Sequence, residues 1–156
     1  MLRLHVRDLR GGPASTAGTI DPGDEAFAGL GLVIAEPVRI DGVLQSTDAG
    51  NYLWRGHIHA KLAGECRRCL GDVTVAIDDD VDVLFSADPD LVDEPSVYPL
   101  APQADVIDVT PVVREEIALS ASPFPLCRTD CKGLCARCGA DLNAGPCRCA
   151  AAGSTN

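Results

Sequence analysis

The sequence predicts an α+β fold that is mainly β: an antiparallel meander or barrel-like sheet, with one short helix and a cysteine-rich C-terminal tail. Three observations carry this prediction. Apolar and polar residues alternate with period two through much of residues 2–85. Residues 111–121 instead have the apolar spacing of an amphipathic helix. Six of the eight cysteines lie between residues 127 and 149.

The alternation predicts an antiparallel β body at residues 1–85. The polar residues of each strand share one side, so one face of the sheet is expected to meet water. Asp79 falls on the apolar phase of its strand, which predicts a bulge or bend there. The expected elements are strands at 2–6, 38–45, 52–65 and 73–85, a loop at 11–18, a helical turn leading into a strand within 24–36, and turns at 46–51 and 66–72.

The middle of the chain links this body to the tail. Residues 86–105 combine prolines and acidic residues with little alternation, which predicts an acidic, proline-rich loop. Residues 106–126 are expected to add a strand and the short helix, both packing on the body. Thr110 is placed to cap the helix and Pro111 to begin it. The Ser-Pro-Phe-Pro stretch that follows ends it, because proline cannot continue a helix.

The tail, residues 127–156, has the cysteine spacing of a metal-binding segment. The first residues mix charged and apolar side chains and predict no signal peptide, so a cytoplasmic location is expected. Thiols stay reduced there, which favours metal ligation over disulfides. The six cysteines of the tail are Cys127, Cys131, Cys135, Cys138, Cys147 and Cys149.

Cys135 and Cys138 give the strongest metal signal. Two intervening residues let both sulfurs reach one Zn²⁺ at about 2.3 Å, and Gly139 permits the turn that directs backbone N–H groups toward them. The spacing favours two four-thiolate sites for one or two Zn²⁺ ions, and iron fits the same ligands. The favoured sets are Cys135, Cys138, Cys147 and Cys149 for one site, and Cys66, Cys69, Cys127 and Cys131 for the other.

Other interpretations of the cysteines stay open. Cys66 and Cys69 can form a thiol redox pair, because the two arginines between them lower thiol pKa values. They are expected at a hairpin tip, however, which is typical of a metal knuckle. Since no recognised catalytic motif is present and four protein ligands leave no position for water, no enzyme activity is expected. The competing single site uses Cys127, Cys131, Cys135 and Cys138.

The net charge of −10 is unevenly distributed, because the part of the chain before the tail is strongly acidic and the tail is slightly basic. Residues 1–126 hold nine Lys and Arg against 21 Asp and Glu, whereas residues 127–156 hold four against two. Such a body repels nucleic-acid phosphates and favours a basic protein partner. No apolar run is long enough to span a membrane, so no membrane contact is expected. No small-molecule substrate is expected either, since no recognised catalytic motif is present. The expected contacts with RNA or a partner are Arg67, Arg68, Lys132, Arg137 and Arg148.

Four segments together resemble a known family. They are Cys-Arg-Arg-Cys-Leu at 66–70, Ile-Asp-Val-Thr-Pro-Val-Val-Arg-Glu-Glu-Ile-Ala-Leu at 107–119, Pro-Leu-Cys at 125–127, and Cys-Lys-Gly-Leu-Cys-Ala-Arg-Cys-Gly-Ala-Asp-Leu-Asn at 131–143. In these segments the chain resembles the YceD family of bacterial and plastid proteins. The resemblance covers most of residues 35–149 and is weakest over 1–34.

The resemblance implies a non-enzymatic role in ribosome biogenesis. Members of the family are needed for normal accumulation of large-subunit ribosomal RNA, and their genes often neighbour that of a small, basic ribosomal protein. The expected partners are therefore large-subunit ribosomal RNA or its precursors and a basic ribosomal protein. The alternatives are a redox-responsive zinc protein and a thiol–disulfide oxidoreductase that uses Cys66 and Cys69.

Overall fold

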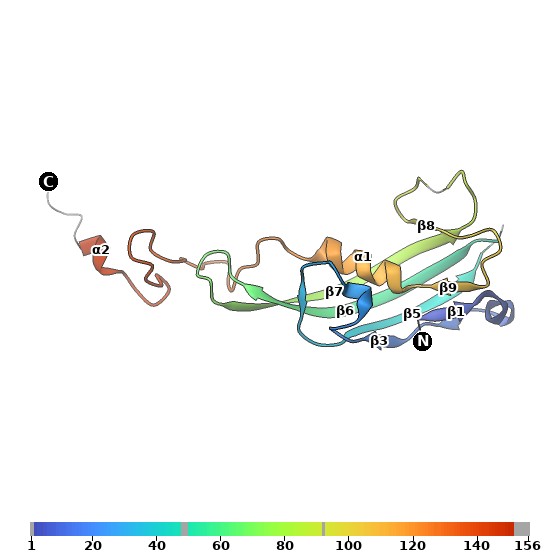
Figure 1. Cartoon of the computed structure of the whole chain (residues 1–156), viewed down its shortest axis with the longest axis horizontal. Helices are drawn as coiled ribbons and strands as arrows, with labels where there is room; N and C mark the ends of the chain where they lie inside the picture. The colour runs from blue at the N-terminus through green and yellow to red at the C-terminus, as the bar shows by residue number, and fades with distance from the viewer. Residues whose placement is uncertain (1, 48–49, 92, 152–156) are drawn as a thin grey trace.

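The computed structural model describes residues 2–47, 50–91 and 93–151. An elongated β body carries one helix across it, and the cysteine-rich segment extends from one end of this body (Figure 1). Part of the expected turn at 46–51 lies outside the described residues. Positions 152–156 of the tail lie wholly outside them. The four-part division of the chain stays a prediction. None of the described helices is long and apolar enough to cross a membrane.

The centre of the fold is an antiparallel meander of three consecutive strands. These are β5 (Val38–Ser46), β6 (Tyr52–Glu65) and β7 (Asp72–Ser86). Their apolar residues meet across the ladder, with Ile40 opposite Ile58. The alternation of apolar and polar residues therefore predicted these strands correctly, because one face of each is buried.

Short strands extend the meander at both edges. β2 (Ala14–Ser15) and β3 (Gly18–Ile20) pair with β5, and β4 (Val33–Ile34) pairs with β6. β8 (Val97–Pro99) runs parallel to β7. Two segments expected as loops, 11–18 and 86–105, thus contribute strands that are too short for a visible alternation.

The barrel-like shape predicted from the sequence is wrong. Over the described residues the main sheet is open, in the order β2-β5-β6-β7-β8. β1 (Arg3–His5) and β9 (Val106–Asp108) form a separate antiparallel pair. A helix and this second pair cover the apolar face of the main sheet, so the sheet need not close on itself to bury that face.

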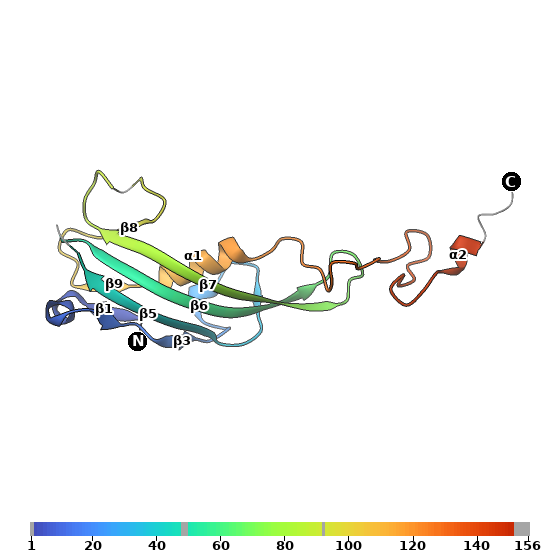
Figure 2. The same cartoon turned by 180° about the vertical axis from the view of Figure 1, so that it is seen from behind.

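The helix α1 (Thr110–Ser120) lies across one face of the sheet, within one residue of the predicted bounds (Figures 1 and 2). The predicted cap is wrong, because Thr110 is already the first helical residue and the N-cap residue, Val109, makes no side-chain hydrogen bond. The Asp108 carboxylate accepts the Thr110 backbone N–H at 2.9 Å. Two 3₁₀ turns, η1 (Val6–Gly11) and η2 (Glu25–Phe27), and the short α2 (Arg148–Ala151) complete the described elements. The helix buries Val112, Val113 and Ile117.

The bulge predicted at Asp79 is also wrong. The pairing of β6 with β7 runs without interruption, and Asp79 lies opposite Ile58. Its carboxylate accepts a hydrogen bond from the Ser120 hydroxyl at 2.6 Å, at the end of α1. Because the helix supplies this partner, a carboxylate occupies an apolar-phase position without breaking the ladder.

Trp54 occupies the centre of the core with no exposed surface. Its indole N–H donates a hydrogen bond to the buried Thr16 hydroxyl at 2.8 Å. A Cβ on Gly56 would lie 2.1 Å from the indole ring, and one on Gly42 would lie 2.7 Å from its nitrogen. Two facing glycines, paired across β5 and β6, therefore make the space in which the one tryptophan of the chain lies.

Candidate metal centre

The eight cysteines form two groups of four in space. In each group the four sulfur atoms lie within 4.8 Å of one another. The grouping is the one that the sequence spacing favoured, and the competing tetrad is split between the two groups. The hairpin cluster consists of Cys66, Cys69, Cys127 and Cys131, and the tail cluster of Cys135, Cys138, Cys147 and Cys149.

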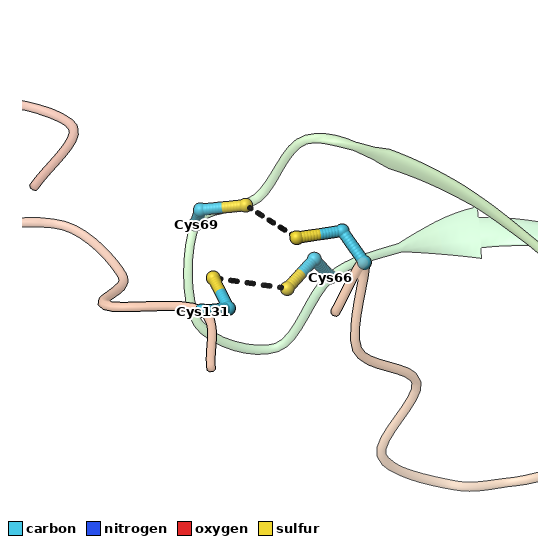
Figure 3. A group of neighbouring side chains, drawn as sticks. Cys66, Cys69 and Cys131 are labelled. Atoms are coloured by element: carbon cyan, nitrogen blue, oxygen red, sulfur yellow. Dashed lines mark hydrogen bonds between the residues drawn. The ribbon is translucent and has the colours of Figure 1, made fainter. Parts of the chain in front are cut away.

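The turn between β6 and β7 builds one half of the hairpin cluster (Figure 3). Cys66 donates its backbone N–H to the Gly71 carbonyl at 2.8 Å, and its own carbonyl accepts from Leu70 at 2.9 Å. Leu70 has a φ of 59°, in the left-handed region. This tight turn places the sulfurs of Cys66 and Cys69 on one side, facing the tail.

Sulfur separations in the hairpin cluster match a tetrahedral thiolate site. Sγ of Cys66 lies 3.8 Å from Sγ of Cys131, and Sγ of Cys69 lies 3.7 Å from Sγ of Cys127. Four sulfurs at about 2.3 Å from one ion stand roughly 3.8 Å apart. A disulfide would need about 2.05 Å, and all eight cysteines are free. The geometry therefore fits a metal ion and not cystines.

Backbone N–H groups favour negative charge on sulfurs of both clusters. The N–H groups of Cys127, Cys69 and Arg68 lower the pKa of the Cys66 thiol to about 6. Burial and the neighbouring thiols raise the pKa of Cys127 to about 12. Four thiolates cannot crowd together without a cation, so the donor set suits an ion that neutralises them.

The tail cluster contains a knuckle of the expected kind. Gly139, at a φ of 73°, donates its N–H to the Cys135 carbonyl at 2.8 Å. The Arg137 N–H points at the Cys135 sulfur at 3.4 Å. Backbone N–H groups of Cys138 and Arg137 lower the pKa of Cys135 to about 6. The turn after the second cysteine thus resembles the one at Leu70, with glycine in place of leucine.

Backbone contacts fasten the tail to the hairpin turn. Arg67 donates its N–H to the Pro125 carbonyl at 3.0 Å, and the Arg68 carbonyl accepts from Leu134 at 3.1 Å. Gly133 fits against this carbonyl, since a Cβ there would lie 2.8 Å from the Arg68 oxygen. The tail therefore lies against the hairpin tip on both sides of the hairpin cluster.

Asn143 ties the segment between Cys138 and Cys147 to the hairpin cluster, a role that sequence reasoning missed. Its side-chain oxygen accepts the Lys132 backbone N–H at 2.8 Å, and its side-chain nitrogen donates to the Cys131 sulfur at 3.4 Å. Leu142 beside it donates its N–H to the Gly133 carbonyl at 2.9 Å. The available signal was an asparagine, a residue able to donate and accept at once, four positions after Gly139.

The structure gives the five expected contact residues different surroundings. Arg67 lies over the exposed Phe124 ring, 4.4 Å from its centre. Arg68 donates from its guanidinium to the Cys131 carbonyl at 2.9 Å, so part of its hydrogen-bonding capacity holds the tail. The remaining three are exposed; they are Lys132, Arg137 and Arg148.

Comparison with known proteins gives the family. The model of the family described as "Large ribosomal RNA subunit accumulation protein YceD" matches residues 54–155. An uncharacterized protein of Mycobacterium leprae is 31% identical over 124 residues, which are 75% of this chain and 56% of that protein.

Two further relatives are uncharacterized proteins of Mycobacterium bovis and Mycobacterium tuberculosis. Each is 27% identical over 118 residues, which are 74% of this chain and 55% of the relative. The chain thus spans about half the length of the curated relatives it matches. No solved structure matches it. With the matched region covering β6, β7, α1 and both cysteine clusters, the chain belongs to the YceD family.

Proposed function

We propose that this protein is a non-enzymatic factor in ribosome biogenesis that supports the processing or accumulation of large-subunit ribosomal RNA in the cytoplasm. The observation that carries the proposal is the match of residues 54–155 to a family described by large ribosomal RNA subunit accumulation. Because both cysteine clusters lie inside this match, we assign them to the part of the chain that performs the role.

Both clusters are proposed to hold structural Zn²⁺, one ion each. Support comes from the separations near 3.8 Å in the hairpin cluster and from N–H groups directed at sulfur in both clusters. Four protein ligands close such a site to water, which suits a scaffold rather than a catalyst. The ions would hold the tail at the tip of the β6–β7 hairpin.

The surface around the two cysteine clusters is the proposed contact with large-subunit ribosomal RNA or its precursors. Phe124 is 60% exposed and stacks with Arg67, and such a cation–aromatic pair suits an unpaired base. The exposed side chains of Lys132, Arg137 and Arg148 would contact phosphates. The acidic body would hold a basic ribosomal protein instead.

A redox-responsive zinc protein is the second candidate. Cys127 and Cys138 are exposed, one in each cluster, so an oxidant can reach both sites. An oxidoreductase that uses Cys66 has less support, because Cys66 is fully buried at a hairpin tip. Release of zinc at micromolar peroxide would favour the redox candidate, whereas retention at millimolar peroxide would exclude it.

The test of the proposed function is a depletion strain that expresses tagged wild-type protein or a variant. Wild type is expected to co-sediment with precursors of the large subunit and to restore large-subunit ribosomal RNA. A Phe124→Ala/Arg67→Ala variant should keep its metal and lose most of this association. Val33→Ala, which removes an apolar side chain of similar exposure from β4, is the matched control. Unchanged ribosomal RNA on depletion would exclude the proposal.

A further inference from the structure

Among the residues that the structure describes, no strand lies beside the outer edge of β7 over most of its length. β8 pairs only with Leu84–Ser86, at the end of a strand of 15 residues. Between Asp72 and Val83, β6 lies on one side of β7, and the other side pairs with no strand in the described residues. The view in Figure 1 shows β8 at one end of this long strand only.

Hydrogen bonds to the β8 region show which residues face this edge. Leu84 donates its N–H to the Ser96 carbonyl at 2.9 Å, and the Ser86 carbonyl accepts from Leu100 at 2.7 Å. In an antiparallel ladder the backbone groups of alternate residues point to opposite sides. The same alternation therefore directs N–H and C=O groups outward at Thr74, Ala76, Asp78, Asp80 and Asp82.

Acidic side chains surround these free backbone groups. Asp78, Asp80 and Asp82 lie on the edge itself and stay mostly solvent-accessible, although Asp82 lies 3.6 Å from Arg55, and Asp78 and Asp80 both contact His57. Glu115 and Glu116 of α1 face the same region, where they and β7 line a hollow of about 300 Å³. Between Cys69 and Val113 the sequence contains no Lys or Arg. A ligand on this edge would thus meet negative charge on two sides.

The hollow beside the edge also has an apolar part. Val81, Val83 and Val112 contribute to its lining, with Leu119 at its rim, 74% exposed. A strand laid along β7 would point every second side chain toward this hollow and the others toward the carboxylates. Alternating small apolar and cationic residues would satisfy both surfaces at once.

We propose that the β7 edge binds an extended, basic segment of a partner protein as an additional strand. Main-chain hydrogen bonds would supply affinity, and the carboxylates would select cationic side chains. A second copy of this chain is disfavoured, because its own β7 edge would bring like charges together. The inference deepens the proposed function, on which it rests for the identity of the basic partner.

The direct test uses full-length, metal-loaded protein and the synthetic peptide Arg-Val-Lys-Thr-Lys-Val-Arg-Thr. Backbone NMR is expected to show shifts and slowed amide exchange at residues 76, 78, 80 and 82. A peptide with Glu at the four basic positions should produce neither. Shifts confined to other surfaces, shifts caused by an RNA oligonucleotide at this edge, or concentration-dependent self-association through it would each overturn the inference.

Two substitutions at one position separate charge from backbone pairing. Asp80→Asn removes the charge and is expected to weaken peptide binding several-fold. Asp80→Pro also removes the outward N–H while leaving the β6 ladder intact, and should weaken binding at least a further tenfold. Asp41→Asn on β5 makes the same charge change away from the edge and should have little effect. Trp54 emission checks that each variant folds.

The result is separable from the fate of the proposed function. Equal peptide affinities of Asp80→Pro and Asp80→Asn would overturn strand addition, even if the protein co-sediments with large-subunit precursors. Normal ribosomal RNA in the depletion strain would exclude the proposed function, even if the peptide binds at the edge. If Asp80→Pro, unlike Asp80→Asn, loses both peptide binding and co-sedimentation with large-subunit precursors, strand addition and the proposed function are both supported.

Discussion

Sγ of Cys66 and Sγ of Cys131 lie 3.8 Å apart, although 65 positions separate the two residues in the chain. One belongs to the tip of the β6–β7 hairpin and the other to the tail. A bound metal ion would therefore link the hairpin tip and the tail, two segments with few apolar side chains to pack against each other.

Removal of metal is expected to release the tail and spare the sheet. Protein purified without chelator should contain two ions per chain by elemental analysis. Cys69→Ser should lose one ion and Cys138→Ser the other, because each belongs to a different cluster. A chelator removes the metal, and acid releases it by protonating the ligand thiolates. Either treatment should therefore abolish the protection of the Leu134 amide against hydrogen exchange. Native protein without metal would contradict this expectation.

Gly133→Ala is expected to detach the tail from the hairpin tip. The new Cβ would lie 2.8 Å from the Arg68 carbonyl oxygen, at a φ of 74°. The left-handed backbone costs about 1 kcal/mol, and the clash adds to it. Hydrogen exchange at Leu134 should accelerate at least tenfold. Gly31→Ala, at a φ of 68° with open space around it, is the control and should leave Leu134 protected.

Leu70→Gly is expected to stabilise the hairpin turn by about 1 kcal/mol. Leucine has a φ of 59° there and is 60% exposed, so little burial is lost. Urea denaturation of the metal-loaded protein measures the change. Leu70→Ala keeps the backbone strain and should give no gain; an equal gain from both substitutions would mean that the strain is not what changes the stability.

Gly56→Ala is expected to destabilise the fold by about 3 kcal/mol, because its Cβ would displace the indole ring of Trp54. Emission of this one tryptophan should shift to the red as the ring leaves the core. Gly23→Ala, which meets no atom within 4 Å, should change neither quantity. An unshifted emission spectrum in a folded Gly56→Ala protein would disprove the packing argument.

His57 is expected to stabilise the sheet in acid more than in base. The carboxylates of Asp80 and Asp78 lie 2.9 Å and 2.5 Å from its ring nitrogens and raise its pKa. A raised folded-state pKa gives stability that is complete below about pH 6.5, the value in unfolded chains, and is lost as pH rises through the folded value.

The measurement for His57 is the difference in melting temperature between wild type and His57→Gln from pH 5 to 9. The difference should be largest at the acid end and vanish at the basic end. In Asp78→Asn/Asp80→Asn the same comparison should lose its pH dependence, because the anions that favour the charged ring are gone. A difference that grows with pH would refute the assignment.

Local patterns in the sequence predicted much of this structure. Alternation gave β5, β6 and β7 within a residue or two, since a half-buried strand places every second side chain in the core. Spacing of cysteines favoured the grouping into two clusters. The alternation and the cysteine spacing both involve residues close together in the sequence, so they can be recognised without knowledge of the fold.

Other features depend on partners that are distant in sequence. Asp79 keeps the ladder regular only because Ser120 reaches it from α1. The β8 strand forms because it pairs with the edge of β7, and its three residues are too few to show an alternation that would predict it. Likewise, the open shape of the sheet follows from α1 covering its apolar face.

The meander and the helix could therefore be predicted from the sequence, and the two-cluster grouping of the thiols was favoured by it, because residue periodicity and ligand spacing are properties of neighbouring positions. Three features depend on the folded chain: Asn143 reaches the Cys131 sulfur, Arg68 holds the tail, and β7 has no second neighbouring strand from Asp72 to Val83 within the described residues. These features depend on contacts between residues that are distant in sequence. Hydrogen bonds of this kind produce no periodic pattern in the sequence, so they cannot be predicted from it.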